Sequence, residues 1–222
     1  MRTLYHTWLC PFSRKIRLQL AEKKLDFTLT FEKIWEKRPA FLEMNPTGQT
    51  PVLVDLDGTV VVGSIPIGEY IEEAYPQHPL MSSGPAERAE ARRLICWFED
   101  KFYHEVTHNL VFQKTIKRHI EKVGPDSNLI REGQTRIHDH LEYICYLTDH
   151  RKWLAGESIS LADITAAAQL SAIDYLGDVP WSKHILAKDW YARIKSRPSF
   201  RSLLQDRYPA LTPASHYHDL DF

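Results

Sequence analysis

The residues that decide the fold are Asn45-Pro46-Thr47-Gly48-Gln49-Thr50-Pro51-Val52-Leu53. Pro51 stands directly before an apolar, β-prone run, although proline lacks the amide that a central strand donates to its neighbour. A cis peptide bond between Thr50 and Pro51 would reconcile the two observations, because X-Pro bonds adopt the cis form at small cost. It would also turn a backbone amide and carbonyl outward, toward an extended peptide ligand. The alternative is a trans proline at the first position of a strand.

Four short β-prone runs bounded by turn residues predict the strands of one small sheet. They lie around Leu4 and at residues 27–31, 51–55 and 59–62. Helical periodicity fills residues 13–24, between the first two runs, and residues 64–75, after the last. The order strand, helix, strand, connector, strand, strand, helix is that of a thioredoxin-like α/β domain, which we place at residues 1–76.

Residues 77–85 lose this periodicity and collect Pro, Gly and Ser, a composition typical of a linker. No strand pattern returns after it. Helices are predicted at about 86–117, 128–150, 160–175 and 187–196, with a short one near Phe200. We therefore predict an all-helical second domain over residues 86–207, followed by a C-terminal tail over residues 208–222 that has no helical or strand period.

The composition limits the partners and the compartment. The 222 residues contain 28 Lys and Arg against 29 Asp and Glu, so the charge balance argues against a nucleic acid partner. No apolar run approaches the ~20 residues of a membrane span, and the opening Met-Arg-Thr-Leu-Tyr predicts a strand rather than a signal peptide. We expect a cytoplasmic protein with no direct membrane insertion. Three scattered cysteines without a CxxC pair leave only single-thiol chemistry.

The motif at residues 45–53, followed by a helix that Ser64 would cap, resembles the glutathione-transferase family. A second match is Ser160-Leu-Ala-Asp163, which is similar to the family's capping box, where Ser and an acid three residues later satisfy the free amides of a core helix. The resemblance spans the whole chain. It implies the two-domain transferase fold, with Pro51 as its cis-proline.

In this family an acidic residue followed by Ser binds the γ-glutamyl end of glutathione, and Gly63-Ser64 occupy those positions here. The resemblance thus implies a glutathione site at Thr50, Pro51, Gly63 and Ser64. Gly63 offers no carboxylate to an ammonium group, so some binding free energy is missing. We expect this glutathione site to be weak or vestigial, and we expect no required cofactor.

Cys10-Pro11-Phe12-Ser13 stands at the start of the first predicted helix, where free amides and the helix dipole favour a thiolate. Cys10 matches the active-site cysteine of omega- and beta-like transferases and glutaredoxins, which form mixed disulfides with glutathione. A glutathione-dependent thiol transferase that uses Cys10 as nucleophile is therefore one alternative for the function. The other interpretation of Cys10 is a small buried residue.

His104-Glu105-Val106-Thr107-His108 matches the zinc-protease signature, in which two His one helical turn apart bind zinc and Glu acts as base. No Gly-x-x-His follows to supply a third ligand, and a chain with 11 His can produce so short a match by chance. A zinc protease is a remote alternative. We take these His as a polar helix face and predict no metal site.

Two segments suit protein contacts better than catalysis. Trp35 lies beside charged residues in the loop after the second strand, where it could anchor a partner or pack over the sheet edge. The chain ends in Asp219-Leu220-Asp221-Phe222, a composition suited to a docking peptide. The alternative for this tail is a strap packed on its own domain.

The tail, together with residues 174–181 and 195–200, is similar to one branch of the family, whose members bind the tubulin-like GTPase FtsZ. This resemblance implies a homodimeric, non-catalytic protein that binds and curves FtsZ filaments and couples them to cell-wall constriction at the division site. It makes FtsZ and the division machinery the expected partners. Trp35 and the tail residues Asp219, Leu220, Asp221 and Phe222 are the expected contacts.

Overall fold

The N-terminal domain is built on a four-stranded sheet in the order β2-β1-β3-β4. Its strands are β1 (Arg2–His6), β2 (Phe27–Phe31), β3 (Val52–Val54) and β4 (Val60–Val62). β1 pairs parallel with β2 and antiparallel with β3, which pairs antiparallel with β4. The four predicted strands and the thioredoxin-like topology are therefore confirmed. The computed structural model describes residues 1–220.

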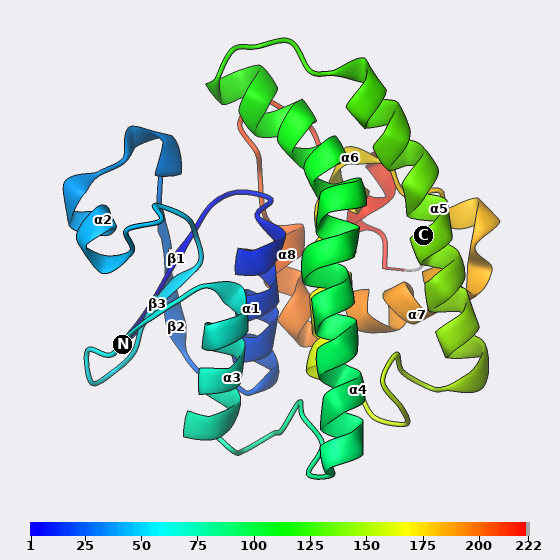
Figure 1. Cartoon of the computed structure of the whole chain (residues 1–222), viewed down its shortest axis with the longest axis horizontal. Helices are drawn as coiled ribbons and strands as arrows, with labels where there is room; N and C mark the ends of the chain where they lie inside the picture. Colours follow the sequence, from blue (N-terminus) through cyan, green and yellow to red (C-terminus); the bar gives the residue numbers. More distant parts are fainter. Residues whose placement is uncertain (221–222) are drawn as a thin grey trace.

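Two helices cover one face of this sheet, α1 (Pro11–Glu22) and α3 (Ser64–Ala74) (Figure 1). Their apolar side chains and those of the strands form a small core of Leu4, Ile16, Leu20, Leu53, Ile67 and Ile71. The helical turn η1 (Ile34–Glu36) and the short helix α2 (Pro39–Met44) lie on the opposite side of the sheet. The sequence did not predict α2, because a six-residue helix with only Phe41 buried produces no periodic pattern.

The C-terminal domain is all-helical, as predicted. α4 (Pro85–Cys96) continues without a break into η2 (Trp97–Ile120), which is wound as a π-helix, and α5 (Ser127–His150) runs back alongside η2 (Figure 1). The central helix α6 (Leu161–Leu176) is followed by η3 (Trp181–Lys183), α7 (Ile185–Lys195), η4 (Pro198–Phe200), α8 (Arg201–Leu204) and η5 (Ser215–His218). Within residues 1–220, no helix is both long and apolar enough to cross a membrane.

The centre of this domain is α6 (Leu161–Leu176), whose residues 161–175 are all buried. The predicted capping box is present at its start, with Ser160 as the N-cap. The Asp163 carboxylate accepts hydrogen bonds from the Ser160 amide, the Leu154 amide and Trp190 Nε1, each at 2.9 Å. One carboxylate therefore links α6 to the preceding loop and to α7. These donors also supply the hydrogen bonds that a buried polar group needs.

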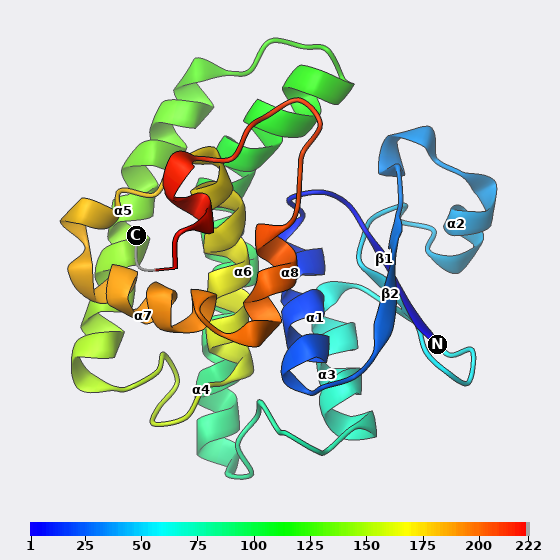
Figure 2. The ribbon, with the colours of Figure 1, turned by 180° about the vertical axis from the view of Figure 1, so that it is seen from behind.

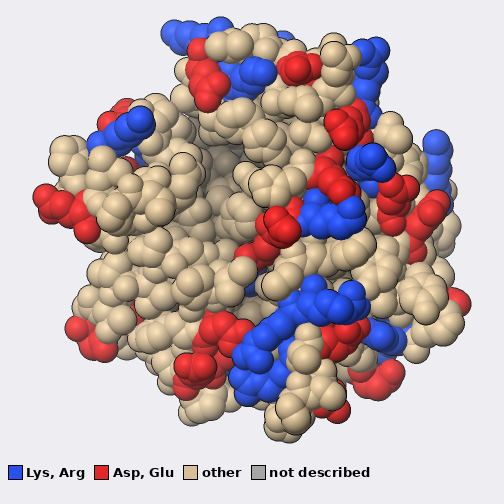
Figure 3. All heavy atoms as spheres, in the orientation of Figure 1, with Lys and Arg blue, Asp and Glu red and all other residues tan. Residues whose placement is uncertain are grey.

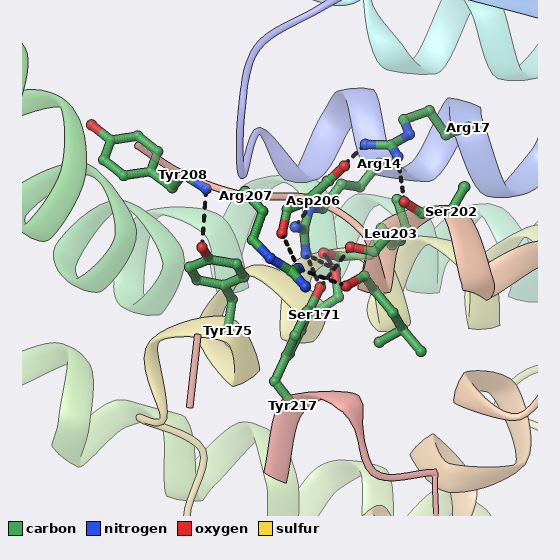
Figure 4. A network of polar contacts seen from close by, with 12 residues as sticks. Arg14, Arg17, Ser171, Tyr175, Ser202, Leu203, Asp206, Arg207, Tyr208 and Tyr217 are labelled. Atoms are coloured by element: carbon green, nitrogen blue, oxygen red, sulfur yellow. Dashed lines mark hydrogen bonds and ion pairs between the residues drawn. The ribbon is translucent and has the colours of Figure 1, made fainter. Parts of the chain in front are cut away.

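The two domains meet where α1 packs on α6, and buried charges hold this contact. Arg14 and Arg17 of α1 both reach the carboxylate of Asp206, at 3.1 and 2.8 Å (Figure 4). The Arg14 side chain is 1% exposed and also donates to Ser171 of α6 at 2.9 Å. Because buried guanidinium groups need acceptors, these contacts fix how α1 sits on the second domain.

The tail is largely a strap on its own domain, which was the alternative to a docking peptide. The Tyr217 ring is fully buried, and its hydroxyl accepts from Arg14 Nη1 at 3.2 Å and donates to the Leu203 carbonyl at 3.1 Å. His216 Nε2 lies 2.9 Å from Asp174 Oδ1. Residues 218–220 follow this anchor on the surface (Figure 2). Asp221 and Phe222, both predicted contacts, lie outside the described residues.

Candidate functional site: a cavity between the domains

A cavity of about 570 Å³ lies between the loops of the N-terminal domain and the helix η2. The loop between β1 and α1, the η1 turn and the Gln49–Thr50 segment form one side, and η2 forms the other. Six aromatic rings line it: Trp8, Phe12, Trp35, Tyr103, His108 and Phe112. Among the described residues, Glu121 is the only Asp, Glu, Lys or Arg in the lining, and Figure 3 shows the hollow surrounded mainly by uncharged residues.

Cys10 lines this cavity and is the N-cap of α1, so it stands at the start of the first helix as the sequence predicted. Its Sγ is 3.8 Å from both Oγ1 and the carbonyl oxygen of Thr50. Tyr103 lies across the cavity, with its ring 4.7 Å from that of Phe12. Burial, together with the nearby Cys10 sulfur, raises the pKa of Tyr103, so its hydroxyl stays protonated at neutral pH.

The cis-proline prediction is confirmed, since the Thr50–Pro51 bond is cis. Of the four residues predicted to bind glutathione, however, only Thr50 lines the cavity, whereas Pro51, Gly63 and Ser64 do not. Gly63 has φ of 88° and ψ of 150°, and its amide donates to the Pro51 carbonyl at 3.1 Å. Because this φ strongly favours glycine, an acidic residue at position 63 would be strained.

Ser64 does not cap α3, contrary to the prediction. It is the first residue of the helix, Gly63 is the N-cap, and no side chain caps this end. The Ser64 hydroxyl instead donates to Glu99 Oε1 at 2.7 Å, and Lys15 Nζ lies 2.7 Å from the same oxygen. Lys15 neutralises Glu99, so this acid cannot replace the missing carboxylate as a partner for an ammonium group. At positions 63 and 64 there is therefore no unpaired carboxylate for the ammonium group of glutathione.

The three side chains of the predicted zinc motif have separate surroundings. His104 is exposed and lies 3.6 Å from Asp100, whereas Glu105 Oε2 is 2.9 Å from His140 Nε2. The His108 ring stacks on Phe112 in the cavity wall, and burial lowers its pKa. Across residues 1–220, no group of three or more His, Cys, Asp or Glu is placed to hold a metal ion. His104 and Glu105 form a polar helix face.

Trp35 is neither fully exposed nor an isolated surface residue. It is half-buried in the cavity wall, and its ring centroid lies 6.1 Å from that of Phe31. From the sequence, both packing over the sheet edge and contact with a partner were open for this residue. The side of the cavity that η2 forms was not predicted, although four of its residues, Tyr103, Thr107, Val111 and Thr115, recur every four positions in the sequence.

Comparison with known proteins agrees with this architecture. Residues 9–74 match the family model of the glutathione S-transferase N-terminal domain, and residues 107–198 match that of the C-terminal domain. The chain belongs to the glutathione S-transferase family.

Among its relatives, FtsZ-localized protein A from Caulobacter vibrioides is 48% identical, with 100% of this chain and 98% of the relative covered. A solved structure of FzlA from C. crescentus superposes with a TM-score of 0.96 over 100% of this chain and 99% of that one. A glutathione S-transferase from Rhodospirillum rubrum F11 is 51% identical, covers 100% of both chains and has a TM-score of 0.97.

Proposed function

We propose that this chain is a non-catalytic cell-division protein that binds FtsZ filaments, curves them and couples them to cell-wall constriction. The observation that carries the proposal is the 48% identity to FtsZ-localized protein A over the full chain. The shared region includes the C-terminal tail, because the match covers 100% of this chain. The name of the relative describes localisation with FtsZ, while filament binding and curvature are our inference.

The glutathione site supports a role other than transfer chemistry. Family membership alone does not establish activity, since one fold serves many functions. Here the Ser64 hydroxyl already donates a hydrogen bond to Glu99, and Gly63 has no side chain to offer a ligand. A thiol transferase through Cys10 would have to bind glutathione without its γ-glutamyl contacts.

The tail is the proposed docking element, and the structure suggests how it is presented. Tyr217 is buried against Arg14 and α8, whereas His218, Asp219 and Leu220 are exposed directly after it. A short segment beginning at a fixed anchor loses less conformational entropy on binding than a free tail would. Trp35 is the second proposed contact. We further propose that the protein acts as a homodimer, located at the division site.

Co-sedimentation with FtsZ polymerised by GTP tests this function. The wild-type protein should pellet with the filaments, and millimolar glutathione should not change the pelleted fraction. The charge reversal Asp219→Lys should weaken co-sedimentation by about tenfold or more, which corresponds to about 1.4 kcal/mol. Asp139→Lys is a matched control, because Asp139 is an exposed acid on α5, outside the tail.

Absence of wild-type protein from the pellet would refute FtsZ binding. Equal loss of binding in both charge reversals would refute the specific role of the tail. Displacement of the protein from FtsZ by glutathione would instead point to a ligand-controlled transferase site. Circular dichroism of both variants confirms that the fold is retained.

A further inference from the structure

The strand β2 leaves one edge of the sheet open. It stands first in the order β2-β1-β3-β4 and, within residues 1–220, pairs only with β1 (Figure 2). The Glu32 amide, just after β2, donates to the His6 carbonyl of β1 at 2.9 Å. Because inward and outward backbone groups alternate along a strand in a parallel pair, this bond fixes which groups point away from the sheet. They are the amides and carbonyls of Phe27, Leu29 and Phe31, and they are free to pair with a further strand.

This edge lacks the features that usually protect an edge strand. Lys, Pro and inward-pointing charges blunt most such edges. β2 contains only Phe, Thr and Leu, and of these Phe and Thr favour extended strands. Leu29, the central residue, is 40% exposed, although its neighbour Leu4 on β1 is fully buried. An exposed apolar side chain thus accompanies the open backbone groups.

The sequence of β2 reads the same in both directions, Phe27-Thr28-Leu29-Thr30-Phe31. A second copy of the chain, related by a twofold axis through Leu29, would place its own β2 antiparallel to this strand. Each Phe would then lie opposite a Phe, each Thr opposite a Thr, and Leu29 opposite the same residue of the other copy. The outward groups of Leu29 would exchange both of their hydrogen bonds with those of its counterpart. One surface would serve both copies, as a twofold contact requires.

The charges around β2 permit this pairing. Residues 27–31 carry no charge, so no like charges meet along the paired segment. One position further out, Asp26 would lie opposite Glu32 of the other copy. Glu32 is already paired with Arg38, whose Nη2 lies 2.6 Å from Oε2, and the Glu32 side chain is only 4% exposed. Asp26 therefore does not meet an uncompensated negative charge.

We propose that β2 is a contact between two copies of this chain, in which the two β2 strands pair antiparallel about Leu29 and join both sheets into one. The contact uses only the outer edge of β2, so β4 at the other edge and the C-terminal domain stay free. Because five residues on each side form a small interface, the association is weak and depends on concentration. The proposal goes beyond the proposed function, and its test uses no FtsZ.

Disulfide trapping in the purified full chain tests the register. Opposite residues of a hydrogen-bonded antiparallel pair have Cα atoms about 5.5 Å apart, within the range that a disulfide bridges. Under oxidation by copper phenanthroline in air, Leu29→Cys should form a dimer linked through position 29, which peptide mass mapping identifies. Thr28→Cys is the matched control and should link far more slowly, because its counterpart lies on the diagonal, about 7–8 Å away. The wild type measures linking by the three native cysteines.

Sedimentation equilibrium measures the association without a cross-link. The average mass of the wild type should rise with concentration above its value in dilute solution. Leu29→Lys removes the apolar contact and places two lysines opposite each other, so it should weaken this association about tenfold. Val123→Lys is the control, since Val123 is another apolar residue, 51% exposed and outside β2.

Three results would overturn the proposal. One is the absence of a disulfide through position 29, which would leave the open edge to an extended segment of another protein. Another is equally fast linking of Thr28→Cys, which would indicate random collision. The third is association of Leu29→Lys that equals that of Val123→Lys. Because Leu29 is exposed, its variants should fold normally, which thermal unfolding confirms.

Discussion

Asp206→Asn is the sharpest test of how the domains are held together. Asp206 Oδ2 lies 3.1 Å from Arg14 Nη2 and 2.8 Å from Arg17 Nη1 (Figure 4). The two Arg side chains are 1% and 3% exposed, and the Asp206 side chain is 14% exposed. Asparagine keeps the shape of the side chain and one acceptor oxygen but removes the charge that both guanidinium groups share.

The expected cost follows from leaving two buried cations without their anion. Removing one partner of a buried ion pair typically costs about 3–5 kcal/mol. Because asparagine can still accept a hydrogen bond, we expect a loss of about 3 kcal/mol in the free energy of unfolding. For a chain of this length, that loss lowers the melting temperature by about 6–12 °C.

Urea unfolding followed by circular dichroism measures this loss directly, with an unchanged denaturant slope expected. The control is Asp139→Asn, which removes an exposed acid lying 3.6 Å from Arg136. Such a surface pair contributes less than about 1 kcal/mol. A loss below about 1 kcal/mol in Asp206→Asn would falsify the view that these buried charges fix α1 on the second domain.

The same carboxylate makes stability depend on pH. Although burial opposes its charge, Arg14 and Arg17 hold the pKa of Asp206 below its usual value in the folded protein. Since the folded pKa is depressed, the stabilisation is present above the ordinary aspartate pKa of about 4 and is lost as pH falls through the folded value. Asp206→Asn should therefore flatten the acid side of the stability profile below about pH 4.

Three further outcomes are expected. Burial, with Arg17 and Arg14 nearby, lowers the pKa of His6 from 6.5 to about 4. As pH falls, the unfolded chain therefore binds a proton at His6 before the folded chain does, and the free energy of unfolding should fall by about 2 kcal/mol between pH 6.5 and 5. Urea titrations at each pH should show a smaller fall in His6→Gln. Asp163→Ala removes the acceptor of four buried hydrogen bonds and should cost more than about 4 kcal/mol, measured by thermal unfolding or seen as insoluble protein. Cys10→Ser should change stability by less than about 1 kcal/mol and leave FtsZ co-sedimentation intact; loss of co-sedimentation would mean that the thiol has a role in FtsZ binding.

The parts of the fold that local patterns encode could be predicted from the sequence. The strands, the long helices, the capping box of Ser160 and Asp163, and the cis bond before Pro51 each leave a signature within a few residues. α2 has no such signature, since it buries only Phe41. Its one local signal was Pro39 at the first helical position.

Contacts between residues far apart in sequence could not be predicted. Ser64 was expected to cap its own helix, but its hydroxyl meets Glu99, 35 residues away. Tyr217 was placed in a tail without regular structure, but Arg14, 203 residues away, holds it in the core. Hydrophobic periodicity carries no information on such pairs, because a buried Arg or Lys looks the same as a solvated one in the sequence.

The anchor at Tyr217 has a consequence for assembly. Arg14 comes from the first domain, Ser171 from the second and Tyr217 from η5, so their contacts form only after η5 has been synthesised and both domains have docked. A truncated or half-folded chain would leave residues 218–220 without their fixed starting point. The segment proposed to recruit a partner is therefore held at a fixed starting point only in molecules whose two domains have docked.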